Sequence, residues 1–365
     1  MAPKIPLVDL EAQLAPIRDE LLAAVTRCID SGRYLLGPEV ERLEKGIAEV
    51  CGVAHAVGAS SGTDALLMSL MALGVGPGDE VVTTAYSFFA NAGVVARLGA
   101  TPVFVDIDRR TFNIDPADID KSVTDRTKAI VPVHLYGQLA EMEAIVSIAD
   151  RHGLVVIEDA AQALGAEGAG RFGVMACFSF YPSKNLGAMG EAGMVVTGDD
   201  GYARALRRLR THGAETTYLH DVVGGNFRMD AIQAAVLNVK LRYLEEWTEC
   251  RREKARRYTE LFQESGLVSS GRVVLPEAIR DHVHHQYVIR TNERDDWKER
   301  LAHEGVASAV YYPVPLPLQP CFSDLGHGPG DFPEAERAAR ETLALPMFPE
   351  LTDDQQRIIV SIVAR

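Results

Sequence analysis

Apolar runs alternate with helix-like patterns through the first two thirds of the chain. The apolar runs predict strands at residues 54–59, 79–84, 101–106, 128–135 and 154–157. Apolar residues at helical spacing predict helices at residues 63–72, 91–98 and 140–152. This alternation predicts a largely parallel sheet covered by helices on both faces, and such sheets bind ligands at the carboxyl ends of their strands.

The pattern changes after about residue 245. A charged helix is predicted at 241–263, with an apolar or aromatic stripe at Leu244, Trp247, Tyr258 and Leu261. Beyond it we expect a strand at 287–290, helices at 295–303 and 353–363, and a Pro-rich segment at 311–317. The chain is therefore divided into a large domain, 1–245, which includes the N-terminal segment, and a smaller α+β domain, 246–365.

Composition narrows the class of protein. The 365 residues carry a net charge of -14, and 47% of them are apolar, as in an ordinary globular protein. The acidic balance argues against nucleic acid as a partner, and no apolar run reaches the roughly 18–20 residues of a membrane span. The N-terminus lacks a secretory pattern, and the five cysteines include no C-x-x-C pair. We expect a cytoplasmic protein without disulfides, a metal site or a membrane contact.

A candidate phosphate site follows the first predicted strand, in Ser60-Ser61-Gly62-Thr63-Asp64-Ala65. Gly62 lets a ligand approach the backbone, and the helix that starts there offers free N–H groups to a phosphate. The alternative is an ordinary capped helix with Ser61 or Thr63 as the N-cap.

Two further segments carry candidate chemistry. A buried strand ends in Glu158 and Asp159, and a carboxylate there could keep a pyridine nitrogen protonated, which makes the ring an electron sink. The carboxylate could equally be the N-cap of a helix that follows the strand. Lys184 follows an aromatic run and precedes a glycine turn, with Ser179 and Ser183 close by. Burial would lower the pKa of Lys184 and favour the free amine that a Schiff base needs, although most lysines in turns face water.

The order of these segments makes the sequence recognisable. It resembles the DegT/DnrJ/EryC1/StrS family of sugar aminotransferases, which are pyridoxal-phosphate (PLP) enzymes of fold type I. The resemblance covers nearly the whole chain and rests on these motifs among others: Gly62-Thr63-Asp64-Ala65-Leu66, Val133-His134-Leu135-Tyr136-Gly137, Glu158-Asp159-Ala160-Ala161-Gln162, Ser179-Phe180-Tyr181-Pro182-Ser183-Lys184-Asn185, Gly225-Asn226-Phe227-Arg228-Met229-Asp230 and Tyr312-Pro313-Val314-Pro315-Leu316.

The resemblance implies roles for individual residues. Lys184 would carry PLP as a Schiff base and move the proton, and Asp159 would pair with the pyridine nitrogen. The remaining cofactor contacts would be Gln162 near the ring hydroxyl, Phe88 stacked on the ring, and Gly62, Thr63 and Ser179 on the phosphate. Asn226 would reach the phosphate of the partner subunit, which implies a homodimer with shared sites. Arg228 and Tyr312 would line the substrate side. Apart from the resemblance, we expect Tyr311 and either His284 or His285 to add hydrogen bonds there.

The implied reaction moves an amino group from L-glutamate to a nucleotide-linked keto sugar. Segments around Asn185 and Asp324 resemble relatives that aminate C3 of a dTDP- or UDP-linked 3-keto sugar, and a C4 aminotransferase is the alternative. Many relatives carry histidine where this chain has Leu318, so specificity is the weakest part of the resemblance. Two further alternatives are a sugar dehydratase on the same fold and a non-catalytic regulator. A sugar dehydratase would have histidine in place of Lys184, and a regulator would need a DNA-binding module.

Other features are open to a second interpretation. His282, His284 and His285 could indicate a metal, but no further ligand cluster accompanies them. Cys321 lies downstream of the lysine, as a desulfurase thiol would. The arginines at 204, 207, 208 and 210 predict a solvated helix face, or else a guide for an anionic substrate.

Overall fold

The computed structural model describes residues 4–216 and 218–365. Its central sheet holds seven strands, in the spatial order β1 (His55–Ala59), β7 (Gly193–Thr197), β6 (Met175–Ser179), β5 (Val155–Asp159), β4 (Thr127–Val131), β2 (Glu80–Thr84) and β3 (Thr101–Val105). β7 runs in the opposite direction to the other six strands of this sheet. The expected parallel α/β architecture is therefore confirmed.

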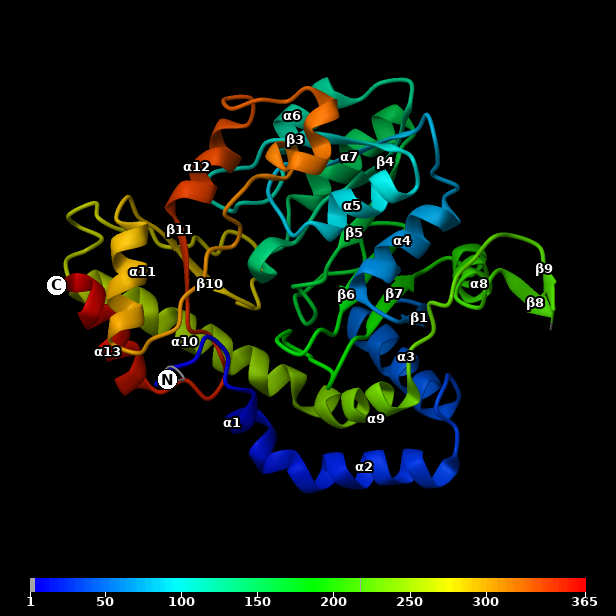
Figure 1. Cartoon of the computed structure of the whole chain (residues 1–365), viewed down its shortest axis with the longest axis horizontal. Coiled ribbons are helices and arrows are strands. Elements are labelled where there is room, and N and C mark those ends of the chain that lie inside the picture. The colour runs from blue at the N-terminus through cyan, green and yellow to red at the C-terminus, as the bar shows by residue number, and fades with distance from the viewer. Residues whose placement is uncertain (1–3, 217) are drawn as a thin grey trace.

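Helices cover both faces of this sheet (Figure 1). Successive side chains of a strand point to opposite faces of the sheet. One of these faces packs against α4 (Gly62–Ala72), α5 (Ala90–Arg97) and α8 (Asp200–Leu209). The other face packs against α3 (Pro38–Cys51), α6 (Pro116–Ser122), α7 (Met142–His152) and α9 (Ala231–Lys240). Outside α9 lies α2 (Arg18–Ser31), which follows α1 (Leu10–Leu14) and a 3-10 turn at Ala15–Ile17.

The C-terminal part forms a second core beside the sheet (Figure 1). The C-terminal part contains α10 (Leu244–Glu264), β10 (Tyr287–Arg290), α11 (Arg294–His303), α12 (Pro333–Glu341), β11 (Thr342–Leu345) and α13 (Asp353–Ala364), and all of these except α12 contribute to the second core. Short 3-10 turns occupy Leu135–Gly137, Leu241–Tyr243, Leu316–Leu318 and Pro320–Leu325, and two short strands, β8 (Ala214–Thr216) and β9 (Leu219–His220), form a hairpin.

The long helix α10 passes from one core to the other. Its first residue, Leu244, packs with the sheet core, whereas Tyr258 and Phe262 pack with the C-terminal core. Ile5, from the N-terminal segment, also joins the C-terminal core and pairs with Val306. The division at residues 245 and 246 stays a prediction, which this change of core along α10 supports.

Three expectations about local structure need correction. The strand predicted at 128–135 ends at Val131, because the chain turns toward the 3-10 turn at Leu135–Gly137. The helix predicted from residue 241 begins at Leu244, after a separate 3-10 turn. Arg210 does not lie on a solvated helix face. It is buried beyond the end of α8, where its guanidinium contacts the Glu44 carboxylate at 2.6 Å.

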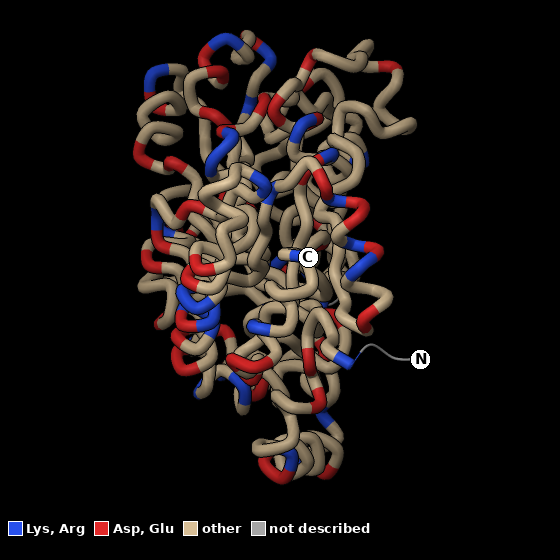
Figure 2. The backbone as a smooth tube through the Cα atoms, turned by 90° about the vertical axis from the view of Figure 1, so that its left-hand side faces the viewer, with Lys and Arg blue, Asp and Glu red and all other residues tan. Residues whose placement is uncertain are grey.

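Charged positions are mixed over the surface. Figure 2 shows acidic and basic residues interleaved on the side that carries the C-terminal part. Among the described residues, no helix combines the length and the apolar character that crossing a membrane requires.

Candidate active site

The strand-end carboxylate predicted as a ring partner lies at the end of β5. Asp159 is buried; one of its carboxylate oxygens accepts the N–H of Ala161 at 3.1 Å, and the other accepts the side-chain amide of Asn91 at 3.3 Å. Burial raises the pKa of Asp159, while these hydrogen bonds and the charge of Lys184 act against that rise. The carboxylate is therefore held in place by donors from a turn and from α5.

Lys184 lies in the turn that follows β6, and β6 is the strand next to β5 in the sheet. Its backbone N–H donates to the carbonyl of Tyr181 at 2.8 Å, which closes the turn. Loss of hydration lowers the pKa of the Lys184 amine to about 8, and the nearby charge of Asp159 opposes the shift. The amine is therefore much more often unprotonated than an exposed lysine at neutral pH, as a nucleophilic amine must be.

Close packing shapes the loop at the start of α4. Ser61 is the N-cap, and its hydroxyl accepts the N–H of Asp64 at 3.0 Å. A Cβ atom on Gly62 would lie 2.6 Å from the Cβ of Ser179, so only glycine allows this approach to β6. The first N–H groups of the helix, at Gly62 and Thr63, have no intrahelical acceptor and present positive charge beside the Ser179 hydroxyl. This loop can hold an anion.

A network of tyrosines supports Gln162. The side-chain oxygen of Gln162 accepts the N–H of Tyr136 at 2.6 Å, and its amide nitrogen donates to the Tyr312 hydroxyl at 3.4 Å. The Tyr86 hydroxyl in turn accepts the N–H of Tyr312 at 2.7 Å. The Phe88 ring has its centre 6.2 Å from that of Tyr312, yet it remains 58% exposed. An exposed aromatic face beside a buried amide is suited to a planar ligand.

His285 contacts Asn185, the residue that follows Lys184 in the chain. A ring nitrogen of His285 lies 3.2 Å from the side-chain oxygen of Asn185. Burial, and then the charge of Lys184, lower the pKa of His285 well below its usual value. His285 is therefore neutral at physiological pH. The backbone carbonyl of Tyr311, the residue before Tyr312, accepts a hydrogen bond from the Tyr86 hydroxyl at 2.7 Å.

The segment that carries Asn226 and Arg228 runs beside the start of the α4 loop. The N–H of Ser60 donates to the carbonyl of Phe227 at 2.9 Å. The Asn226 side chain is exposed, and the Nε of Arg228 is buried without a hydrogen-bond partner among the described residues. The site residues predicted from the sequence thus fall into two groups, one around Lys184 and one in this segment beside the α4 loop.

Sequence reasoning assigned no role to three residues that complete the site. Asn91 holds Asp159, Tyr136 holds Gln162, and Lys240 donates to the carbonyl of Gly187 in the lysine turn. Asn91 and Tyr136 lie in or next to recognised motifs, where a polar side chain signals a contact. Nothing in the sequence marked Lys240 as part of the site, because it is an isolated lysine at the end of an apolar helix pattern.

Two of the three clustered histidines pack against each other. His282 and His284 stack, with their ring centres 3.9 Å apart, and burial lowers the pKa of both. Across residues 4–216 and 218–365, no group of three or more His, Cys, Asp or Glu side chains is arranged to hold a metal ion.

Comparison with known proteins defines the class. Residues 16–364 match the model of the DegT/DnrJ/EryC1/StrS aminotransferase family, and the chain belongs to this family. The family uses pyridoxal 5'-phosphate, and a solved relative from Bacillus subtilis, 34% identical over 94% of this chain and 81% of that one with a TM-score of 0.90, is described with bound PMP cofactor. The expected fold type I architecture and aminotransferase class are thereby confirmed.

Individual relatives align over almost their full length. A pleiotropic regulatory protein of Geobacillus stearothermophilus is 50% identical, with 99% of this chain and 98% of the relative covered. The UDP-N-acetyl-3-dehydro-alpha-D-glucosamine 3-aminotransferase of Acidithiobacillus ferrooxidans is 47% identical, with 99% and 97% covered. A crystal structure of DesV from S. venezuelae, in complex with a ketimine intermediate, superposes with a TM-score of 0.94 at 42% identity and covers 100% of this chain and 98% of that one.

Proposed function

We propose that this protein transfers the amino group of L-glutamate to C3 of a 3-keto sugar linked to UDP or dTDP. The observation that carries the proposal is the Lys184 amine, desolvated to a pKa of about 8 beside the strand-end carboxylate of Asp159. The name of the Acidithiobacillus relative, which states a UDP-linked 3-dehydro sugar and a 3-aminotransferase, supports C3 over C4. The same proposal places the protein in the cytoplasm, where its unpaired cysteines would stay reduced.

The side chains present fit PLP. The loop of Gly62, Thr63 and Ser179 would take the phosphate, since its shape depends on the missing Cβ at Gly62. Asp159 would hold a proton on the pyridine nitrogen, and the tightly hydrogen-bonded Gln162 would lie near the ring hydroxyl. The bound cofactor supplies an electron sink for the carbon that loses or gains the amino group.

Proton transfer falls to Lys184. While the amino donor is bound, the amine of Lys184 would be free and would lie beside the reacting carbon, where it could move the proton before the amino group is transferred. An amine with a pKa of about 8 can both take and return a proton near neutral pH. His285, which is neutral and faces Asn185, adds no positive charge that would lower the pKa of Lys184 further at physiological pH.

A diphosphate needs positive partners that a protein of net charge -14 does not offer at long range. Arg228 is proposed for this role, because its buried Nε lacks a partner among the described residues. Tyr311, Tyr312 and His285 would bound the sugar. Asn226 would serve the partner subunit of a homodimer, and its exposed side chain in the single chain supports this assignment.

Two half-reactions test the function. L-glutamate is expected to convert the yellow holoenzyme to its amine form, and a UDP- or dTDP-linked 3-keto sugar is expected to restore the yellow form. NMR of the product would place the new amine at C3. An amine at C4 would revise the position alone. A holoenzyme that glutamate leaves unchanged would instead favour a regulatory role, the role that the name of the Geobacillus relative states.

A further inference from the structure

A cleft lined by arginines lies outside the proposed active site. It encloses about 340 Å³ between the loop after β3, the segments around β10, and α12. Its charged lining consists of five arginines and two glutamates: Arg109, Arg110, Arg272, Arg290, Arg337, Glu277 and Glu341. In the whole chain, 51 acidic residues outnumber 37 basic ones, so this local excess of positive charge reverses the overall balance.

The arginines are only partly neutralised. Arg290 and Arg337 share one carboxylate, that of Glu341, at 2.8 and 2.9 Å. Arg110 pairs with Asp108 at 3.2 Å and Arg272 with Glu293 at 2.7 Å. With Asp108 and Glu293 added to the two glutamates of the lining, five cations face four carboxylates. Arg110 and Arg337 are both 48% exposed, and ion pairs in that setting are weak enough for a stronger anion to displace.

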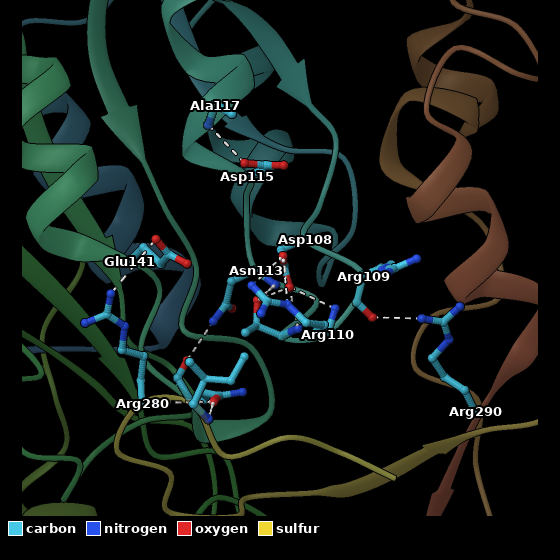
Figure 3. Close-up of polar contacts among 12 residues, drawn as sticks. Asp108, Arg109, Arg110, Asn113, Asp115, Ala117, Glu141, Arg280 and Arg290 are labelled. Atoms are coloured by element: carbon cyan, nitrogen blue, oxygen red, sulfur yellow. Dashed lines mark hydrogen bonds and ion pairs between the residues drawn. The ribbon is translucent and has the colours of Figure 1, made fainter. Parts of the chain in front are cut away.

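The walls of the cleft are fixed to one another. The guanidinium of Arg290 donates to the backbone carbonyl of Arg109 at 2.8 Å, across the gap between the two segments (Figure 3). Asp106 accepts the N–H groups of Glu334 and Ala335, at 2.9 and 2.8 Å, at the start of α12. The segments that carry the arginines are therefore held in place before any ligand arrives, which reduces the entropy lost on binding.

We propose that this cleft binds a phosphate-bearing small molecule of nucleotide size. Planar guanidinium groups match phosphate oxygens in pairs, which favours phosphate over a simple halide. Beside the arginines, Val274 is 54% exposed next to Leu275 and Pro276, so the cleft also offers an apolar surface to an organic group. The volume lies at the lower end of the roughly 300–1,000 Å³ that is typical of ligand pockets.

The cleft is connected to the wall of the active site. The side chain of Asn113, in the same loop as Arg109 and Arg110, accepts the N–H of Leu135 at 2.8 Å and donates to the carbonyl of Gln138 at 3.0 Å. Between those two contacts lies Tyr136, whose N–H holds Gln162. The arginine loop and the backbone that holds Gln162 are therefore linked by direct hydrogen bonds.

Equilibrium binding to the holoenzyme tests the site with three probes: inorganic phosphate, pyrophosphate and UDP. The double variant Arg109→Ala/Arg337→Ala removes two exposed arginines of the cleft. Its control, Arg340→Ala/Arg357→Ala, removes two exposed arginines elsewhere on α12 and on α13, with the same change of net charge. We expect the cleft variant to lose one binding event per chain, or to bind the probe at least roughly tenfold more weakly, and the control to match the wild type.

The outcomes separate the possible ligands. UDP held more tightly than pyrophosphate at the affected site indicates a nucleotide, whereas equal affinities indicate that the phosphate groups alone are recognised. Equal binding of all three probes by the wild type and the cleft variant would overturn the proposal. Transaminase activity without added anion is expected to be the same in the wild type and both variants, so a failure of this site leaves the proposed function intact.

Discussion

Lys240 reaches from the end of α9 to the turn that carries Lys184. Its side chain is almost fully buried, and its amine donates to the carbonyl of Gly187 at 2.5 Å. The turn can form only because Gly187 lacks a side chain. A Cβ atom there would lie 2.1 Å from the carbonyl oxygen of Pro182. A buried lysine thus fixes the backbone three residues beyond the proposed catalytic one.

Lys240→Met is expected to change how stability depends on pH. Burial lowers the pKa of Lys240 from 10.5 to about 8, so between these values the unfolded chain binds more protons than the folded one. This lysine therefore makes the wild type more stable as the pH rises from about 8 to 10.5, by on the order of 3 kcal/mol in total. The variant lacks this rise, so its stability relative to the wild type falls across the window.

Urea unfolding of both proteins at several pH values between 7 and 10.5 measures the effect. Lys298→Met, at an exposed position of α11, is the matched control and should follow the wild type. A constant difference between Lys240→Met and the wild type at all these pH values would show that the pKa of Lys240 is not lowered.

Gly62→Ala is expected to weaken PLP binding by at least roughly tenfold, which corresponds to ~1.4 kcal/mol. The added Cβ would lie 2.6 Å from the Cβ of Ser179, so the loop must move away from the position where its N–H groups meet the phosphate. Gly76→Ala is the control, because a Cβ there meets no atom within 4 Å. Titration of the apoenzyme with PLP compares the two, and equal affinities would remove Gly62 from the phosphate site.

The sequence predicted five of the seven strands of the sheet, because buried strands leave clear apolar runs, but it did not predict β6 or β7. Ser61 as N-cap of α4 and the buried stripe of α10 were also anticipated. It failed at Arg210, since a helical pattern of arginines does not show that Glu44, far away in the chain, lies 2.6 Å from one of them. The arginine cleft was missed for the same reason. Its members come from four separated segments, each unremarkable alone.

Asp159→Asn should preserve the fold and reduce turnover by at least ~10²-fold, as loss of one preorganised charge does. The amide keeps nearly the same volume, and the N–H of Ala161 can still donate to its oxygen. Without the negative charge, a proton on the pyridine nitrogen of PLP is no longer favoured. Steady-state kinetics of this variant and of Asp150→Asn, an exposed position on α7, make the comparison. Turnover within a few-fold of the control would exclude Asp159 as the ring partner.

The last prediction concerns the homodimer. Tyr218 and Val223, around the β8–β9 hairpin, are 93% and 88% exposed in the single chain, and large exposed apolar residues of this kind mark contact surfaces. Asn226 follows this segment closely in the chain, and we predict that a partner covering the hairpin brings its own active site near Asn226. The two subunits of a twofold dimer would then exchange this residue reciprocally.

Mixing two inactive variants tests the exchange. In a heterodimer of Lys184→Ala and Asn226→Ala chains, one site combines the intact Lys184 of one chain with the intact Asn226 of the other, and the second site carries both changes. Random pairing of equal amounts makes half of the dimers mixed, so about a quarter of all sites should be active under the twofold arrangement. Cofactor titration first establishes that Asn226→Ala alone is damaging. If it is, and subunits that are shown to exchange regain no activity, each site is built from a single chain.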